Sequence, residues 1–249
     1  TTVSNTIADI LEANGRKVLS NRAGSNMWSG IATTLLAGCT LSGKLREGYD
    51  TAVLEVDERS SSRIYPYVQP DVLVVTNLYR DSIKRNGHSE FIFDKIAQAL
   101  PAETHLLLNG DDMISGLLGE GRNERVFFRV AKTDRSTDTC VNTACDCSAC
   151  PRCGHLLAFD YFHYHHIGRA HCPECGFTLP EATYEAVDTD FEAGSFMLRE
   201  PGQANLRLPC KQGSLFSVYN ITAAVGCCRM LGLAGADIAR ALEGPSERT

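Results

Sequence analysis

The chain has 249 residues, of which 43% are hydrophobic and 22% are charged, and its formal net charge is −6 at pH 7. A chain of this length can bury a sizeable core, as one large domain or as two small ones. The acidic balance argues against nucleic acid as the main partner, because phosphate binding requires clustered lysine and arginine side chains. No apolar run approaches the ~20 residues that a membrane span needs, and the first residues lack the pattern of a secretory signal.

The first half of the chain alternates between helix and strand patterns. Apolar residues recur on one face of a predicted helix over 1–13, which ends at Asn14-Gly15. The elements expected after it are a strand over 17–20, a helix over 27–36, strands over 51–56 and 72–76, a helix over 88–100 and a strand over 104–109. Continuous apolar strands separated by helices indicate a parallel sheet covered on both faces, and hence an α/β fold.

The second half predicts shorter strands and a helical end. The strands are expected over 125–131, 183–190, 195–200 and 205–209, followed by a long helix over 214–235 and a short helix over 235–244. Apart from a duplicated cysteine motif, the sequence contains no internal repeat and no low-complexity segment.

The duplicated motif consists of Cys150-Pro-Arg-Cys153-Gly and Cys172-Pro-Glu-Cys175-Gly. Two C-x2-C pairs at this spacing are typical of a zinc ribbon, in which four thiolates hold one ion tetrahedrally. The glycine after each second cysteine permits a positive φ that turns backbone amides toward the sulfurs. Disulfides or redox-active pairs are the alternatives. The total of 11 cysteines is odd and no export signal is visible, which favours a reducing cytoplasm.

Further cysteines and histidines lie close to this motif. Three cysteines precede it and are alternative ligands: Cys140, Cys145 and Cys147. Four histidines lie between its halves: His163, His165, His166 and His171. A catalytic zinc site would combine histidine ligands with an open position, whereas four cysteines close the site. We therefore expect a structural ion, with histidines that are exposed to solvent or packed against aromatic rings. Because the segment has few basic residues, a structural or partner-docking insert is favoured over nucleic-acid binding.

Polar side chains follow three of the predicted parallel strands. They are Glu55, Asp57, Glu58, Asn77, Asp81, Asn109, Asp111 and Asp112. Sheets of this kind bind ligands at the carboxyl ends of their strands, where carboxylates commonly hold Mg²⁺ on a nucleotide. Helix capping is the alternative role of Asp81 or Asp112 when each is taken alone. Three polar clusters in succession indicate a site.

Several short segments, in their order along the chain, resemble the ATP-binding middle domain of the Mur ligase family. The segments are IADILEANGRKVLSNRAGSNMWSGI, AVLEVDE, VVTNLYRDSIKRNG, LLLNGDD and VYNITAA. With a four-cysteine ribbon inserted after RVFFRV, the chain is similar to the ligase-like subunits of lipid II isoglutaminyl synthases. The resemblance implies a P-loop-like middle domain over 1–139 and 183–249 and an inserted ribbon over 140–182. It also leads us to expect that the family's N-terminal phosphate loop and C-terminal domain are absent.

The resemblance implies ATP-dependent amidation of the D-glutamate α-carboxylate in the lipid II stem peptide. An acyl phosphate would form first, and ammonia from a GatD-like glutamine amidotransferase would then give D-isoglutamine, in the cytoplasm at the inner face of the membrane. The implied cofactors are ATP, Mg²⁺ and a structural Zn²⁺. The alternatives are an amino-acid-adding ligase of the Mur or folylpolyglutamate type and a non-catalytic zinc-ribbon interaction module. Alone, the chain is expected to bind zinc but little nucleotide, and to turn nothing over.

The same resemblance implies roles for individual residues. The catalytic candidates are Glu55, Glu58, Asn77 and Asp81, and either glutamate matches the family's metal-binding glutamate. The nucleotide-binding candidates are Thr1, Thr2, Asn109, Asp112 and Asn220. Thr1 matches the hydroxyl residue that follows the phosphate loop, and Asn220 matches the asparagine that contacts adenine. Ser217 stands where the family usually has a further asparagine.

Overall fold

The computed structural model describes residues 2–22, 25–44, 46–78, 89–141, 147–210 and 213–244. Its helices are α1 (Thr2–Ala13), α2 (Trp28–Gly38), α3 (Ser61–Ile64), α4 (Ser89–Ala99), α5 (Leu215–Met230) and α6 (Gly235–Glu243), with 3-10 turns η1 (Glu58–Ser60) and η2 (Ser115–Leu117). Its strands are β1 (Val18–Ser20), β2 (Thr51–Val53), β3 (Val72–Val75), β4 (His105–Asn109), β5 (Arg125–Val130), β6 (Ala158–Tyr164), β7 (Ile167–His171), β8 (Tyr184–Asp190), β9 (Ser195–Arg199) and β10 (Leu206–Pro209).

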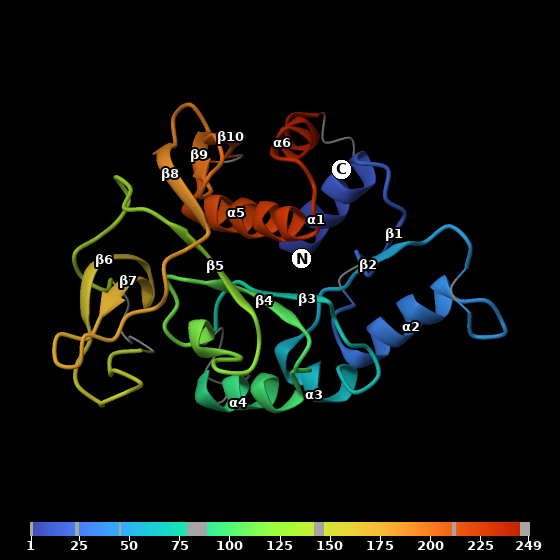
Figure 1. The fold of residues 1–249 in the computed structure, drawn as a ribbon, viewed down its shortest axis with the longest axis horizontal. Coiled ribbons are helices and arrows are strands. Elements are labelled where there is room, and N and C mark those ends of the chain that lie inside the picture. The colour runs from blue at the N-terminus through green and yellow to red at the C-terminus, as the bar shows by residue number, and fades with distance from the viewer. Residues whose placement is uncertain are drawn as a thin grey trace.

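A six-stranded sheet forms the centre of the molecule, in the order β10–β9–β8–β5–β4–β3 (Figure 1). Strands β3, β4, β5 and β8 run parallel, and β9 and β10 continue the sheet in antiparallel pairing. The carboxyl ends of the four parallel strands therefore share one edge, where such sheets bind their ligands. The predicted α/β fold with a mostly parallel sheet is confirmed.

Strands β1 and β2 pair with each other in parallel, as a separate two-stranded sheet. The strand expected over 51–56 ends at Val53, and the side chain of Asn21 explains why. Its Oδ1 accepts a hydrogen bond from Glu55 N at 2.9 Å, and its Nδ2 donates to Glu55 O at 2.8 Å. Because a side chain occupies both backbone groups of Glu55, they are not available to a strand ladder.

Helices cover both faces of the six-stranded sheet, with α1 and α5 on one face and α3 and α4 on the other (Figure 1). The three leucines of β4 illustrate the two layers. Leu107 packs in the cluster that contains the buried residues of α5, whereas Leu106 and Leu108 pack with Ile92 and Ile96 of α4. This alternation follows from the two-residue period of a strand.

Helix α5 is apolar around most of its circumference, which is typical of a helix enclosed by other elements. Small residues let it approach the sheet closely. A Cβ atom at Gly226 would lie 2.8 Å from the ring of Tyr184 on β8, so a larger residue would force the two elements apart. In the part of the chain that the structure describes, no helix combines the length and apolar character that crossing a bilayer requires.

The segment between β5 and β8 forms a lobe around the antiparallel hairpin β6–β7 (Figure 1). Two of its residues, Ala170 and Leu179, pack against Met113, which follows β4. The lobe is therefore docked where the parallel strands end. The boundaries expected for the insert, 140–182, fall within this segment.

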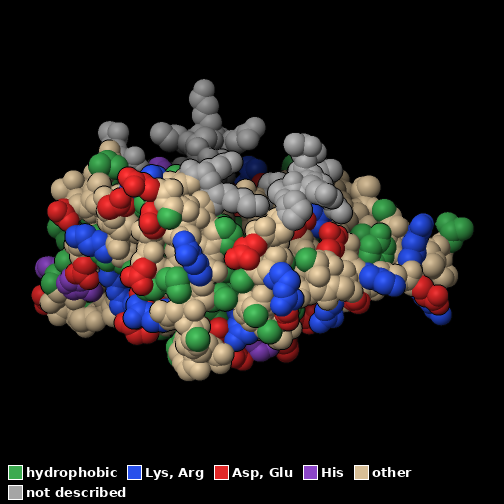
Figure 2. Space-filling model, turned by 90° about the horizontal axis from the view of Figure 1, so that it is seen from above, with side chains coloured by type: hydrophobic (Ala, Val, Ile, Leu, Met, Phe, Trp, Pro, Cys, Tyr) green, Lys and Arg blue, Asp and Glu red, His purple; other side chains and the backbone are tan. Residues whose placement is uncertain are grey.

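The surface carries charges of both signs. On the face shown in Figure 2, acidic and basic side chains are interspersed among polar and apolar ones. Some of these charges pair across elements: Arg22, for example, contacts both Asp9 and Glu12 of α1. A face with mixed charges lacks the broad positive field that attracts a polyanion.

Candidate functional site

Glu55 lies beside the first turn of α1, just beyond the end of β2. Its Oε2 accepts a hydrogen bond from Ser4 Oγ at 3.5 Å, and its Oε1 accepts one from Asn26 Nδ2 at 3.1 Å. The N-terminus of a helix has a partial positive charge and free amide groups, which favour anions close to it. Glu55 is therefore held beside the N-terminal turn of α1, and its binding of a metal ion stays a prediction.

The second candidate glutamate lies farther along the chain, on η1. The carbonyl oxygen of Glu58 accepts a hydrogen bond from Ser61 Oγ at 2.8 Å, and this bond spans the turn η1. Of the two threonines expected near the phosphates, Thr2 is exposed at the start of α1, and Thr1 lies outside the described residues. Glu55 thus makes a side-chain hydrogen bond to Ser4 of α1.

The segment after β3 carries Asn77. Its side-chain Nδ2 lies 3.5 Å from Thr76 Oγ1, at the limit of a hydrogen bond. The backbone is fixed on both sides of it: Asn109 Nδ2 donates to Thr76 O at 2.8 Å, and Leu78 N donates to Asp112 Oδ2 at 2.8 Å. Two residues at the end of β4 therefore determine the course of the chain around Asn77.

Asp112 is fully buried and accepts three hydrogen bonds. Besides Leu78 N, its donors are Ile114 N at 2.9 Å and His166 Nε2 at 3.0 Å, both at Oδ1. Burial acts to raise the pKa of Asp112, but the hydrogen bond from His166 and the other donors hold that pKa below its ordinary value. Both oxygens are used inside the protein, which suits a role in positioning. Contact of Asp112 or of Asn109 with a nucleotide stays a prediction.

Asp111, the neighbour of Asp112, connects α5 to the sheet by hydrogen bonds. Oδ2 of Asp111 accepts hydrogen bonds from Tyr219 Oη at 2.7 Å and from Val130 N at 2.9 Å, while Oδ1 is buried with no hydrogen-bond partner among the described residues. Burial raises the pKa of Asp111, and the nearby His163 opposes this shift only in part. This carboxylate therefore belongs to the interior rather than to an open ligand site.

The adenine-contacting candidate Asn220 lies partly buried on α5. The helix begins after Ser214, whose Oγ accepts a hydrogen bond from Ser217 N at 3.2 Å. The position that departs from the family pattern therefore takes part in the helix cap through its backbone. The remaining catalytic candidate, Asp81, lies outside the described residues.

The four predicted cysteine ligands lie together at one end of the lobe. All four sulfurs lie within 4.8 Å of one another, with Cys150 and Cys175 at 3.6 Å and Cys153 and Cys172 at 3.5 Å. A tetrahedral zinc ion with bonds of 2.3 Å places its sulfurs about 3.8 Å apart. The donor set and its spacing thus fit Zn²⁺, and the predicted clustering of these cysteines is confirmed.

The backbone around these cysteines has the expected geometry. Arg152 N donates to Cys150 Sγ at 3.4 Å, and Cys175 N donates to Cys172 Sγ at 3.5 Å. The glycines that follow the second cysteine of each pair have φ values of +75° and +71°.

The cysteines that precede the motif lie apart from this cluster or cannot be placed. Cys140 lies between β5 and β6 and donates to His165 O at 3.2 Å, and neither it nor Cys147 belongs to the cluster. Cys145 lies outside the described residues.

Two histidines of the lobe are buried, in different surroundings. His163 packs edge-on against Tyr161 and Tyr219, with its Nε2 3.1 Å from Val130 O, and burial lowers its pKa. The expectation of packing against aromatic rings is confirmed here. For His166 the expectation is wrong, because this side chain is fully enclosed and pairs with Asp112. The reason is that a buried carboxylate must find donors within the protein.

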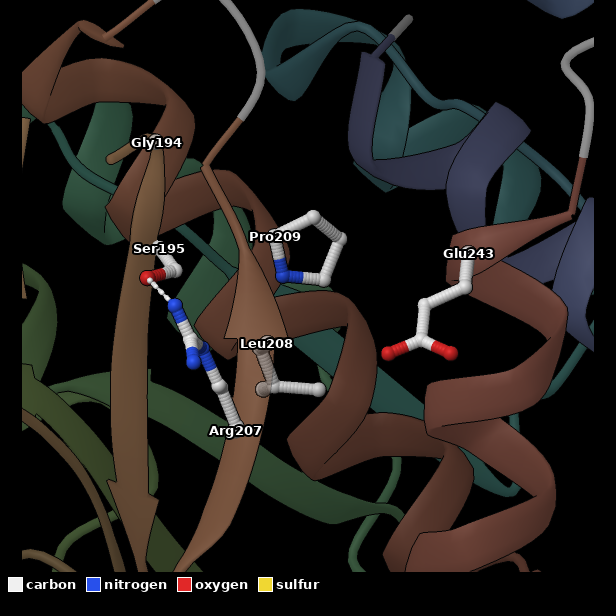
Figure 3. A pocket seen from close by; sticks show the side chains of 6 residues that line it. All are labelled: Gly194, Ser195, Arg207, Leu208, Pro209 and Glu243. Atoms are coloured by element: carbon white, nitrogen blue, oxygen red, sulfur yellow. Dashed lines mark hydrogen bonds between the residues drawn. The ribbon is translucent and has the colours of Figure 1, made fainter. Parts of the chain in front are cut away.

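A small cavity of about 140 Å³ lies between the β9–β10 hairpin and the end of α6 (Figure 3). It is lined by Gly194, Ser195, Arg207, Leu208, Pro209 and Glu243. Arg207 donates to Ser195 Oγ at 3.1 Å. Pockets for molecules of nucleotide size have volumes of ~300 Å³ or more. This cavity contains none of the predicted site residues and is too small for a nucleotide.

Sequence reasoning missed the partners of the site residues. Asn26 and Asn21, which hold Glu55, lie in a segment that predicts only a loop, and Ser4 lies in a predicted helix. The available signal was two asparagines after the strand predicted over 17–20, Asn21 directly after it and Asn26 five residues later. No sequence pattern around His166 or Asp112 indicates that these two side chains pair.

No family model matches the chain. One curated relative is the lipid II isoglutaminyl synthase (glutamine-hydrolyzing) subunit MurT of Staphylococcus aureus (strain COL). It is 32% identical over 234 residues, which are 94% of this chain and 51% of the relative. The chain thus spans about half the length of the curated relatives it matches.

Two solved structures share the fold. A pseudomurein peptide ligase type C from Methanothermus fervidus has a TM-score of 0.73 at 22% identity, over 97% of this chain and 46% of that one. MurF from Acinetobacter baumannii has a TM-score of 0.64 at 18% identity, over 100% of this chain and 44% of that one. The chain is therefore a sequence relative of MurT subunits over nearly its whole length, and it has the fold of the Mur ligases with a four-cysteine ribbon inserted.

Proposed function

We propose that the protein is the ATP-dependent ligase subunit of an enzyme that amidates a peptidoglycan precursor. The substrate is the α-carboxylate of D-glutamate in the lipid II stem peptide, and the product is D-isoglutamine. A carboxylate oxygen attacks the γ-phosphorus of ATP, and ADP leaves. Ammonia then attacks the acyl carbon, phosphate leaves with the bridging oxygen, and a proton from nitrogen passes to solvent.

The observation that carries this proposal is the position of Glu55 at the first turn of α1, in a chain that is similar to MurT over 94% of its length. A carboxylate resists attack by ammonia because its charge repels the nucleophile and oxide is a poor leaving group. Phosphorylation removes both obstacles. The protein must therefore hold a nucleotide, a metal ion and a carboxylate close together.

Glu55 is the metal ligand that we propose, in preference to Glu58. Mg²⁺ prefers oxygen ligands, and a carboxylate beside a helix N-terminus can bind it while the helix amides bind phosphate. Thr2 would add a hydroxyl group at the same turn, and Thr1, which lies outside the described residues, is proposed to bind the phosphates as well. When bound, Mg²⁺ neutralises the phosphoryl oxygens during transfer. Ser4 and Asn26 hold the Glu55 carboxylate in position.

We propose roles for the other candidates as well. Asn77 and Asp81 follow β3, and we propose that they orient the reacting carboxylate. Asn220 would contact the adenine, and Asn109 the segment that carries the phosphates. The lobe has a structural role in this proposal: its four cysteines bind Zn²⁺, which stabilises a hairpin whose small apolar cluster is shared with Met113.

The partner and the location follow from the same proposal. Ammonia reacts with water to give ammonium, so it is best delivered directly by a GatD-like glutamine amidotransferase subunit. Lipid II is anchored in the membrane, so the reaction would occur in the cytoplasm at its inner face. An amino-acid-adding ligase is the second candidate function, because the MurF structure shares the fold.

The test is a lipid II amidation assay with the natural protein and its GatD-like partner, with glutamine, ammonium or single amino acids as the nitrogen source. Glu55→Gln and Glu58→Gln form a matched pair. We expect Glu55→Gln to lose at least 100-fold in amidation and to require more Mg²⁺, and Glu58→Gln to retain most activity. Incorporation of an amino acid in place of ammonia would support the second candidate. Absence of ATP binding by the natural protein would refute both.

A further inference from the structure

A chain of buried hydrogen bonds connects the lobe to the segment that carries Asn77. His166 Nε2 donates to Asp112 Oδ1 at 3.0 Å, and Asp112 Oδ2 accepts from Leu78 N at 2.8 Å. The side chains of His166 and Asp112 are both fully buried. Asp112 therefore connects His166 of the lobe to the backbone amide of Leu78. Leu78 is the neighbour of the candidate catalytic residue Asn77.

We propose that His166 is a positioning residue, which orients Asp112 so that the backbone at Leu78 keeps Asn77 in its working position. This inference rests on the proposed function, in which Asn77 helps to orient the reacting carboxylate. It gives the inserted lobe a role in the reaction beyond holding its own shape. A misplacement of about 1 Å in a group that positions a substrate can cost roughly 100-fold in rate, even when the substituted residue is far from the reacting atoms.

The geometry distinguishes this role from simple docking of the lobe. Other contacts already dock it: His163 Nε2 and Tyr161 Oη each bond to Val130 O, at 3.1 and 3.3 Å, and Gly168 N donates to Asp111 O at 2.9 Å. These contacts end on β5 or on the backbone of Asp111, and none of them reaches the segment after β3.

The chemistry of His166 also suits positioning better than stabilisation. Its Nδ1 is buried with no partner among the described residues, and an unsatisfied buried nitrogen lowers stability. Asp112 without His166 keeps its two backbone donors but loses the side chain that fixes one of its oxygens. Two donors would then hold the carboxylate in place of three, Ile114 N at Oδ1 and Leu78 N at Oδ2, and the hydrogen bond from Leu78 would weaken as the less constrained side chain shifts.

The experiment uses three variants of the natural protein in complex with its GatD-like partner. His166→Phe removes the donor and keeps a buried ring. His166→Gln places an amide nitrogen close to the position of Nε2 and is the conservative rescue. His163→Phe is the matched control, because it loosens the lobe without touching Asp112. Amidation kinetics and hydrogen–deuterium exchange of the segment 76–78 are measured for each, with unfolding temperature and zinc content as checks.

We expect His166→Phe to lower kcat/KM for lipid II at least ~10-fold and to speed exchange in 76–78, while zinc content stays unchanged. We expect His166→Gln and His163→Phe to remain within ~3-fold of the natural protein. Unchanged exchange in His166→Phe, normal activity despite faster exchange, or an equal loss in His163→Phe would overturn the proposal. If the natural protein does not amidate lipid II, the proposed function fails, while exchange still decides whether His166 holds the backbone at Leu78.

Discussion

Replacing Asp112 by asparagine tests the buried centre of the site in a way that is independent of catalysis. The substitution keeps the shape of the side chain and removes its charge and one of its acceptor oxygens. Three donors now reach the carboxylate, namely Leu78 N, Ile114 N and His166 Nε2. An amide has a single oxygen, so at least one of these donors must face its NH₂ group.

The expected loss follows from these contacts. An unsatisfied buried donor costs about 1–3 kcal/mol, and each of the two remaining hydrogen bonds weakens by about 1 kcal/mol once its acceptor is no longer charged. Asp112→Asn should therefore lower the free energy of unfolding by about 3–5 kcal/mol. Since domains are stable by only ~5–15 kcal/mol, the variant should fold but denature much earlier.

Urea denaturation at two pH values checks this number. The pKa of Asp112 is lowered in the folded protein, so its stabilising effect is present above its unfolded pKa near 3.8 and is lost as the pH falls through the lower folded value. The difference between the natural protein and Asp112→Asn should be complete at pH 7 and smaller at pH 3. The control is Asp138→Asn, an 87% exposed side chain whose loss should cost less than ~0.5 kcal/mol. A difference below 1 kcal/mol for Asp112→Asn at pH 7 would refute the reasoning.

Three further predictions concern the lobe and the core. Cys172→Ser should abolish stoichiometric zinc binding and remove exchange protection from β6 and β7 but not from β4, as measured by metal analysis and hydrogen exchange; retained zinc would contradict it. Gly168→Ala would place a Cβ 2.2 Å from Tyr161 O and should lower stability by about 1–3 kcal/mol in thermal denaturation. Burial raises the pKa of Asp111, so its protonated form is favoured in the fold, and the natural protein should lose stability relative to Asp111→Asn as the pH rises from 4 to 7. Parallel stability–pH curves for these two proteins would show that reasoning to be wrong.

Local patterns predicted most of the fold. A few neighbouring residues were enough to predict the helix end at Asn14-Gly15, the apolar strands and the paired cysteines. The reason is that helix propensity, the burial pattern of a strand and the spacing of metal ligands all depend on residues close together in the sequence. The strand expected over 51–56 ends early, and no pattern in the neighbouring sequence predicts this. Asn21, 34 positions away from Glu55, takes its backbone hydrogen bonds.

The candidate site was predicted less well than the fold. Polar residues at the strand ends were expected to face a ligand, yet Asp111 and Asp112 turn into the protein and bond to α5 and to the lobe. From the sequence, a buried carboxylate with internal donors looks the same as an exposed one. The difference depends on His166, 54 positions away from Asp112, and on the way the lobe is docked. Spacing along the chain could predict the edge of the sheet but not the direction of each side chain.

The place of the lobe in the strand order also affects how the chain folds. β5 and β8 are neighbours in the sheet, yet residues 131–183 separate them, so their pairing must close a long loop. The entropy lost in closing a loop rises with the logarithm of its length. Once the ion has joined the two cysteine pairs and the hairpin has formed, the flexible stretch that remains is far shorter. Supply of zinc would then speed assembly of the central sheet as well as of the lobe.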